Sequence, residues 1–272
     1  MSFMRSTDGT NLFYRDWGTG PAIVFAASLG VSGEIWNYNL PYFAERGYRV
    51  IALDRRGHGR SDDLGKGYDL DTLAGDIGAL IDQLDLRDVT LVGHSLGGAE
   101  VLRCAGRAAS AKKNPRVRRV VSIAATAPYL EKTADNPQGV ERERFEQLWA
   151  TVKADAPGWV AANIEPFFTP TTPRALMEWG ANLLLATPLI VWLAGSHTVV
   201  DSDLRPDLRA IDVPALFLHG AQDVSVSVQF GRYAAELVRG SQLKIYDDGA
   251  HGVFVTHADA LNADILAFMQ NH

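Results

Sequence analysis

A Gly-His-Ser-Leu-Gly motif, with the G-x-S-x-G spacing of a nucleophilic serine on a tight turn, runs from Gly93 to Gly97. The apolar run Val89–Val92 precedes it and predicts a buried strand, and the pattern from Ala99 onward predicts a helix. A serine on such a turn has an unfavourable backbone conformation, so its neighbours two positions away must be small. The helix would point its N-terminal amides at charge that develops on the serine. The motif therefore indicates that Ser95 is a nucleophile, although a glycine-rich turn with an incidental serine also fits these five residues.

A nucleophilic serine needs a base and an acid that orients the base. Asp223 follows a predicted strand over 214–219, and His251 follows the next one, over 242–246. Because the carboxyl ends of parallel strands meet at one edge of a sheet, we expect both side chains to lie near Ser95. The order serine, aspartate, histidine is the one that this arrangement requires. His251 would take the serine proton and return it to the leaving group, and Asp223 would fix the histidine tautomer.

Other residues compete for these two roles. A lone histidine is usually structural, and we favour His251 because it combines the chain order with a loop at a strand end. The remaining histidines are His58, His94, His197, His219, His257 and His272. Of these, His58 lies in a loop from which it would brace the site by hydrogen bonding, and His94 points elsewhere from the turn. Asp247 and Asp248 are rival acids, but they lie so close to His251 in sequence that we expect turn roles for them.

An oxyanion hole needs two backbone N–H donors beside the nucleophile. The residue after the nucleophile, Leu96, supplies one in this kind of turn. The second comes from the loop after the first long parallel strand, where we choose Leu29, with Ser28 and Gly30 adjacent. Removal of one such donor typically costs roughly 10²–10³ in turnover.

The elements that must position these residues alternate between strand and helix. Strands are expected over 11–17, 22–26, 48–53, 89–92, 117–124, 214–219 and 242–246, and helices over 36–46, 71–84, 228–238 and 257–270. We expect the first two strands to form an antiparallel hairpin at the sheet edge. The alternation predicts a mainly parallel sheet with helices on both faces, an α/β fold.

The alternation lapses between Thr126 and about Arg205, where Trp149, Trp159, Trp179 and Trp192 lie. A mostly helical insertion fits this stretch best. We therefore divide the chain into a first core part over 1–126, a helical cap over 127–205 and a second core part over 206–272.

The composition and charge of the chain limit the classes of partner that we expect it to bind. The chain has 272 residues, 47% of them hydrophobic and 21% charged, which is ordinary for a globular protein with a real core. A net charge of −6 argues against nucleic acid and anionic membrane surfaces as main partners. The start, Met1–Thr10, shows no signal peptide, and the apolar stretch Leu183–Ala194 is too short to span a bilayer. With the single Cys104, these features predict a cytoplasmic protein with no membrane association.

No sequence motif indicates a metal or a cofactor. The chain has no H-E-x-x-H, C-x-x-C or phosphate-binding G-x-x-x-x-G-K-[ST] pattern. The run Gly93–Gly98 resembles a dinucleotide fingerprint, but its spacing is wrong. We therefore expect catalysis without a cofactor or metal ion.

Together these residues resemble the α/β-hydrolase superfamily over the whole chain, and most of all the cofactor-free bacterial haloperoxidases, which are aryl esterases and perhydrolases. The matching stretches are Asp54–Ser61, Val92–Ser95, Ile211–Pro214 and Leu261–Asp264. The resemblance implies an eight-stranded sheet with a helical cap, the triad Ser95, Asp223 and His251, and oxyanion amides at Leu29 and Leu96. It also implies a small-molecule ester substrate and allows a homo-oligomer.

One loop departs from that family. Its usual His-Gly-Trp-Pro-type loop is here Ala27-Ser28-Leu29-Gly30, so Gly30 replaces the proline that is associated with perhydrolysis. The Ser-Leu-Gly run is instead similar to the loop of 3-oxoadipate enol-lactonases. We therefore prefer hydrolysis of a small carboxylic ester or lactone to a peroxide-dependent reaction.

The cap aromatics are candidates for an apolar substrate pocket, although packing of cap helices explains any one of them equally well. The candidates are Phe167, Phe168, Trp179 and Trp192. The alternative functions are a haloperoxidase or perhydrolase side activity and a non-hydrolytic use of the same fold, as a cofactor-free oxygenase, a lyase or a ligand receptor.

Overall fold

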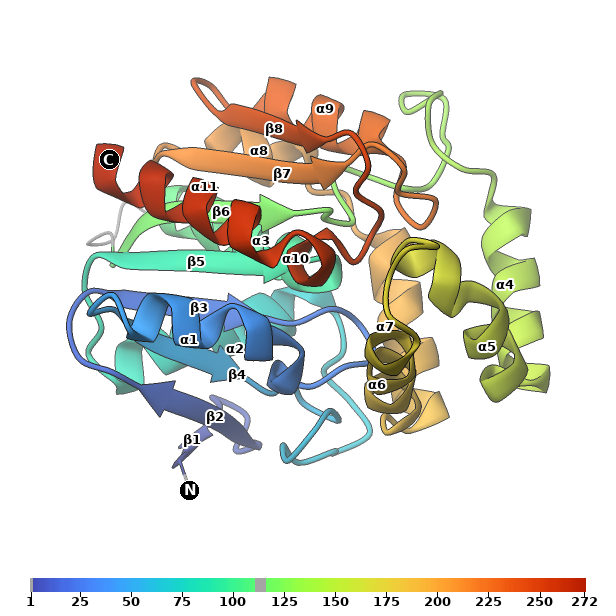
Figure 1. Ribbon diagram of the computed structural model, residues 1–272, viewed down its shortest axis with the longest axis horizontal. Coiled ribbons are helices and arrows are strands. Elements are labelled where there is room, and N and C mark those ends of the chain that lie inside the picture. Colours follow the sequence, from blue (N-terminus) through green and yellow to red (C-terminus); the bar gives the residue numbers. More distant parts are fainter. Residues whose placement is uncertain (1, 111–115) are drawn as a thin grey trace.

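One sheet of eight strands forms the centre of the computed structural model, which describes residues 2–110 and 116–272 (Figure 1). The strands follow the order β1-β2-β4-β3-β5-β6-β7-β8. The pairs β1–β2 and β2–β4 are antiparallel, and all other neighbouring pairs of this sheet, including β4–β3, are parallel. The strands are β1 (Ser2–Arg5), β2 (Asn11–Trp17), β3 (Ala22–Ala26), β4 (Arg49–Leu53), β5 (Val89–His94), β6 (Val117–Ile123), β7 (Ala215–Gly220) and β8 (Gln242–Tyr246).

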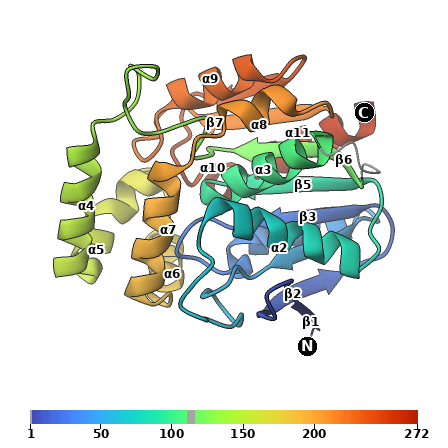
Figure 2. The ribbon, with the colours of Figure 1, turned by 180° about the vertical axis from the view of Figure 1, so that it is seen from behind.

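Helices cover both faces of this sheet. In Figure 1 the front face carries α1 (Leu40–Ala44) and α11 (Ala258–Asn271), with the short η1 (Gly33–Tyr38) and α10 (Val253–Thr256) beside them. The view from behind shows the second layer (Figure 2), made of α2 (Leu70–Gln83), α3 (Leu96–Ser110), α8 (Arg205–Ala210) and α9 (Val228–Leu237). Two separate apolar clusters fill the layers on the two faces, which confirms the predicted α/β-hydrolase architecture.

Five helices lie between β6 and β7, and the first four of them interrupt the alternation of strand and helix. These four are α4 (Arg142–Ala154), α5 (Ala156–Phe167), α6 (Arg174–Leu185) and α7 (Leu189–Asp201). Both ribbon views place them beyond the carboxyl ends of the parallel strands, where α/β folds keep their sites (Figures 1 and 2). We refer to α4–α7 as the cap.

The predicted hairpin of the first two long strands is wrong, because β4 lies between β2 and β3. Tyr14 of β2 pairs with Leu53, and Val24 of β3 pairs with Ile51. The connecting glycine turn crosses the start of β4 so closely that a Cβ on Gly18 would lie 2.3 Å from the Tyr48 carbonyl oxygen. The glycines thus permit a crossing over β4 rather than a tight hairpin.

Two more local expectations need correction. The predicted helix over 36–46 is divided into η1 and α1 at the buried Asn39, whose amide donates to Phe254 O (3.1 Å) and Asn262 Oδ1 (2.8 Å). The strand β1 was not predicted, because a single side chain of this edge strand, Met4, is buried.

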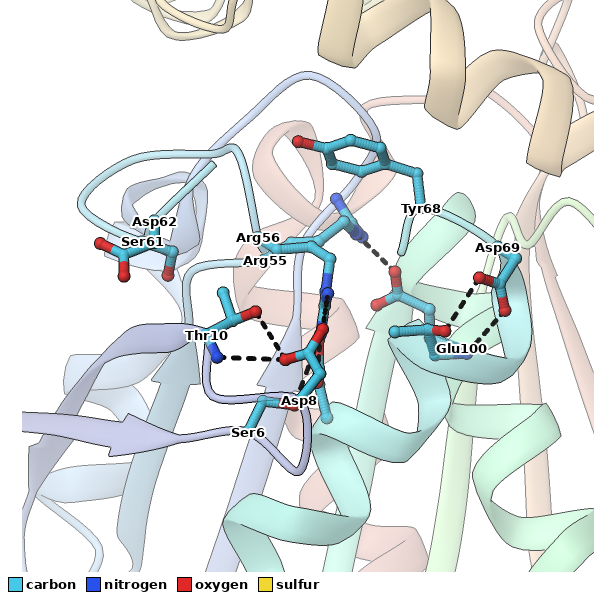
Figure 3. A network of polar contacts seen from close by, with 12 residues as sticks. Ser6, Asp8, Thr10, Arg55, Arg56, Ser61, Asp62, Tyr68, Asp69 and Glu100 are labelled. Carbon is cyan, nitrogen blue, oxygen red and sulfur yellow. Dashed lines mark hydrogen bonds and ion pairs between the residues drawn. The ribbon is translucent and has the colours of Figure 1, made fainter. Parts of the chain in front are cut away.

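A buried arginine ties the first strands to the second layer of helices. The Arg56 guanidinium donates to both carboxylate oxygens of Asp76 on α2, at 2.8 and 2.9 Å. It also contacts Asp8 at 2.8 Å, in the turn between β1 and β2 (Figure 3). Because the arginine side chain is only 1% exposed, its charge depends on these partners for compensation.

We predict that Asp76→Ala lowers the free energy of unfolding by about 3 kcal/mol or more, because it leaves the buried Arg56 charge largely unpaired. Asp71→Ala on the same helix is the control. Asp71 is half exposed and pairs with Arg103 and Arg107, so its loss should cost at most about 1 kcal/mol. Urea unfolding measures both variants, and equal losses would contradict the importance of the buried pair.

Candidate active site

Ser95 lies on a strained turn between β5 and α3. Its φ is +56°, in the left-handed region that residues other than glycine rarely adopt. The two flanking glycines have no room for a side chain: a Cβ on Gly93 would lie 2.1 Å from Gly97 O, and one on Gly97 would lie 2.2 Å from Ala26 O. The turn therefore requires both glycines, as the motif predicts.

Asp223 and His251 lie together on the loops after β7 and β8. Their contact is a 2.7 Å hydrogen bond between His251 Nδ1 and Asp223 Oδ2. The other carboxylate oxygen, Oδ1, accepts the backbone amides of Ser225 and Val226, each at 2.8 Å. Burial opposes ionisation of Asp223, but the charge of His251 and these hydrogen bonds outweigh it and hold the pKa of the carboxyl below its ordinary value.

The ionised carboxylate fixes the tautomer of His251. A carboxylate only accepts hydrogen bonds, so Nδ1 carries a proton, and in the neutral ring Nε2 therefore has the lone pair. The His251 ring and Ser95 line the same cavity. Within the described residues no direct hydrogen bond joins Ser95 Oγ to this ring, and such contacts commonly tighten only when a substrate is bound.

A second histidine links the Ser95 turn to the loop that carries His251. His94, directly before Ser95, is completely buried, and burial lowers the pKa of its ring well below its ordinary value. Its Nε2 lies 2.8 Å from His251 O and therefore donates to that carbonyl. Nδ1 then accepts the hydroxyl hydrogen of Ser28. His94 thus holds the His251 backbone and the Ser28 loop together.

The loop after β3 carries the predicted oxyanion donor Leu29. Arg55 fixes the position of this loop, because its guanidinium donates to Ala27 O at 2.5 Å and to Ser28 O at 2.9 Å. The same guanidinium forms a buried ion pair with Glu100 of α3, in which burial raises the pKa of the carboxyl against the pull of the arginine (Figure 3).

The two predicted oxyanion amides, Leu29 N and Leu96 N, make no backbone hydrogen bond to any residue that the structure describes. Free donors beside a nucleophile are what a developing oxyanion needs. The Arg55–Glu100 pair bridges the elements that carry these amides, the loop after β3 and helix α3.

His58 holds the next residue of the loop. Its Nδ1 donates to Arg56 O at 2.9 Å, so its unprotonated Nε2 accepts the Gly30 amide at 3.0 Å. Burial and the nearby Arg55 charge lower the pKa of the His58 ring to about 3, which keeps this nitrogen an acceptor. The expected bracing role of His58 has a direct contact to support it.

A largely apolar cavity of about 370 Å³ lies between the sheet edge and the cap. From the core it is lined by Ser28, Leu29, Ser95 and His251, and from the cap by residues that include Phe167, Phe168 and Trp192. Trp179 lies outside it. Helix α6 turns Gly180 and Leu184 toward the cavity, and the Trp179 ring instead packs edge-on against Tyr38 at 5.7 Å.

The structure brings Ser95, Asp223, His251 and the Leu29 loop to one sheet edge. Sequence reasoning missed Arg55, Glu100 and the roles of Ser28 and His94. The signal available for them was a charged or polar side chain at a position that the strand and helix patterns mark as buried, as Glu100 is on α3.

Over residues 2–110 and 116–272 no cluster of three or more histidine, cysteine, aspartate or glutamate side chains is arranged to hold a metal ion. In the same ranges no single helix is long and apolar enough to cross a membrane, while α6 and α7 pass that test only as a pair bent by 94°.

Comparison with known proteins agrees with this geometry. The family model described as alpha/beta hydrolase fold matches residues 21–258. The chain belongs to the α/β-hydrolase fold family. A non-heme haloperoxidase from Rhodococcus erythropolis is 37% identical to this α/β hydrolase, and a bifunctional esterase/perhydrolase from Acinetobacter calcoaceticus is 32% identical, each over 100% of both chains.

A solved esterase from Exiguobacterium antarcticum has a TM-score of 0.92 to this α/β hydrolase, with 28% identity and 99% of each chain covered. These similarities confirm the predicted resemblance to the haloperoxidase and esterase group of the family.

We predict that His58 makes the stability of this α/β hydrolase depend on pH. An unfolded histidine has a pKa near 6.5, so below that pH the unfolded chain binds a proton that folded His58, with a pKa of about 3, does not. The stabilisation is present above pH 6.5 and is lost as the pH falls toward 3. Between pH 7 and 5, the wild type should lose about 2 kcal/mol more than His58→Gln does.

Urea unfolding at the two pH values measures this difference. The buried His94 lowers the stability at low pH in the same way in the wild type and in His58→Gln. Its contribution therefore cancels in the difference between them. His272→Gln, at the exposed C-terminus, is the control and should follow the wild type. Parallel pH profiles for the wild type and His58→Gln would show that His58 is not neutral in the folded protein.

Proposed function

We propose that this α/β hydrolase is a serine esterase or lactonase that cleaves a small carboxylic ester or lactone through an acyl-enzyme on Ser95. One observation carries the proposal. Ser95, on its strained turn, opens into the same apolar cavity as His251, whose Nδ1 is bound by the ionised carboxylate of Asp223. The esterase names of two full-length relatives support the same reaction class.

In the acylation step, Ser95 Oγ attacks the carbonyl carbon of the ester while its proton moves to His251 Nε2. Asp223 stabilises the imidazolium that results. The amides of Leu29 and Leu96 hold the negative charge on the carbonyl oxygen. Collapse of the tetrahedral intermediate breaks the ester bond, and His251 returns its proton to the departing alkoxide oxygen.

In the deacylation step, a water molecule gives a proton to His251 Nε2 and attacks the acyl carbon. The bond to Ser95 Oγ then breaks, and the proton passes from His251 to that oxygen, which releases the carboxylic acid. With a lactone the alcohol formed in the first step stays attached to the acyl group, so one molecule of hydroxy acid is the product.

The cavity favours a substrate that is apolar around its reacting carbonyl. Phe167, Phe168 and Trp192 contribute aromatic surface from the cap, while polar side chains such as Ser95 and His251 gather at its floor. Apolar walls with a few convergent polar groups are the usual character of a small-molecule site.

We predict that Ser95→Ala lowers kcat for p-nitrophenyl acetate by roughly 10⁴–10⁶-fold and abolishes labelling by a fluorophosphonate. The matched control is Ser225→Ala, which changes an exposed serine of the same cavity and should leave both readouts nearly unchanged.

Two outcomes would contradict nucleophilic catalysis. If Ser95→Ala keeps the activity of the wild type, His251 acts as a simple base, as in a lyase or a cofactor-free oxygenase. If the wild type is labelled at Ser95 but turns over no ester or lactone in a panel of short-chain substrates, the site binds a ligand rather than cleaving it.

Perhydrolysis is a second candidate, because one relative is named an esterase/perhydrolase and another a haloperoxidase. In that reaction hydrogen peroxide replaces water in the attack on the acyl-enzyme and gives a peracid. The Gly30 position argues for hydrolysis as the main activity. Its φ is +81° and its amide donates to His58, whereas proline has a φ near −65° and no N–H.

We predict that Gly30→Pro, which restores the proline associated with perhydrolysis, lowers the free energy of unfolding by more than about 1 kcal/mol. It should also lower ester hydrolysis without raising the ratio of peracid to carboxylic acid formed in hydrogen peroxide. Gly30→Ala keeps the amide donor and serves as the comparison. A raised peracid ratio in Gly30→Pro would show that the loop adopts the other conformation at little cost.

A further inference from the structure

A second apolar cavity lies inside the cap, beside the catalytic cavity. Its volume is about 390 Å³, and it is bounded by the end of α4, the start of α5 and the turn between α6 and α7. Among the residues that the structure describes, no charged side chain lines it. The single hydroxyl in its wall, on Thr187, is already used, because it donates to Gly30 O at 2.8 Å. The walls of the cavity are therefore uncharged, and their one hydroxyl is already bonded. Such walls suit an apolar ligand.

The two cavities share part of their lining. Trp159, Val160, Leu184 and Trp192 line both of them. The rings of Trp159 and Trp192 lie 5.3 Å apart between centroids and are tilted by 53° to each other. Trp159 and Trp192 are both partly exposed, and a change of rotamer of either ring would join the two cavities.

The outer rim of the second cavity carries exposed apolar side chains. Leu185 is 45% exposed and Leu189 is 38% exposed, and the adjacent Ile190 is 75% exposed. Large apolar side chains that gather at the mouth of a cavity commonly mark a ligand-binding surface. This rim continues the uncharged lining outward.

We propose that the second cavity binds the distal part of a linear apolar chain of the ester substrate, which passes between Trp159 and Trp192 from the reacting carbonyl at Ser95. The natural substrate is then an ester with an uncharged chain of medium length rather than an acetate. This proposal rests on the proposed ester hydrolysis. Burial of each additional methylene raises kcat/KM by roughly threefold to fourfold until the cavity is filled.

The first test removes one of the two tryptophan rings that line both cavities. Trp159 is the better choice, because Trp192 lies against Gly30 in the oxyanion loop: a Cβ on that glycine would be 2.7 Å from the Trp192 ring. Trp159→Ala should raise kcat/KM for p-nitrophenyl decanoate roughly tenfold relative to p-nitrophenyl acetate. The control is Trp149→Ala, which removes a half-buried cap tryptophan that packs against His197 and lines neither cavity.

Filling the cavity is the opposite test. Ala186 lines the second cavity alone, so Ala186→Phe should lower kcat/KM for the decanoate ester by roughly tenfold, the equivalent of two buried methylenes, and spare the acetate ester. Ala161→Phe, at an exposed position of α5 outside both linings, should have no such effect.

A binding measurement separates this proposal from the proposed function. Calorimetry with decanoate is carried out on Ser95→Ala and on Ser95→Ala combined with Ala186→Phe, and we expect about tenfold weaker binding to the latter. Weaker binding without ester turnover by the wild type would refute the esterase and keep the cavity assignment. Turnover of acetate with equal effects of each cap variant on both chain lengths would keep the esterase and overturn the cavity assignment.

Discussion

The close approach of α3 to the end of β3 is the constraint on which the site depends. Gly97 lies so near the Ala26 carbonyl that no side chain fits between them, and this proximity places the first amide of α3 beside the loop that carries Leu29. The Arg55–Glu100 pair crosses the same junction and holds Ala27 O and Ser28 O. A buried pair of this kind is costly to desolvate, so its contribution is better understood as positioning the loop than as stabilising the fold.

Buried histidines carry the positioning further, and each has a defined proton. His58 accepts the Gly30 amide, His94 joins Ser28 to the His251 backbone, and His219 donates to Val226 O at 2.8 Å with Asp223 Oδ2 only 3.3 Å away. Burial lowers the pKa of the first two, which keeps one ring nitrogen of each as an acceptor. The charged groups beside the site are thus the Asp223–His251 pair and the buried Arg55–Glu100 ion pair.

The sequence allowed the fold class to be predicted, and with it the places of Ser95, Asp223 and His251, because these depend on local patterns: a motif, strand ends and chain order. The strand order near β4 was not predictable in the same way, because a glycine turn permits a tight hairpin and a crossing equally well. Arg55, Glu100 and His94 act through contacts between distant segments, which no local pattern encodes. The prediction that Trp179 lines the cavity does not match the structure, because the side of α6 that faces the cavity depends on how the cap packs.

The cap and the loop that carries Leu29 and Gly30 are not independent. Thr187, in the turn between α6 and α7, donates to Gly30 O, and the Trp192 and Leu184 side chains occupy the space where a side chain on Gly30 would lie. Gly30 is therefore held by His58 from the core and by Thr187, Leu184 and Trp192 from the cap. A side chain at this position requires a different cap surface as well, so the conformation of the loop is coupled to the shape of the cavity.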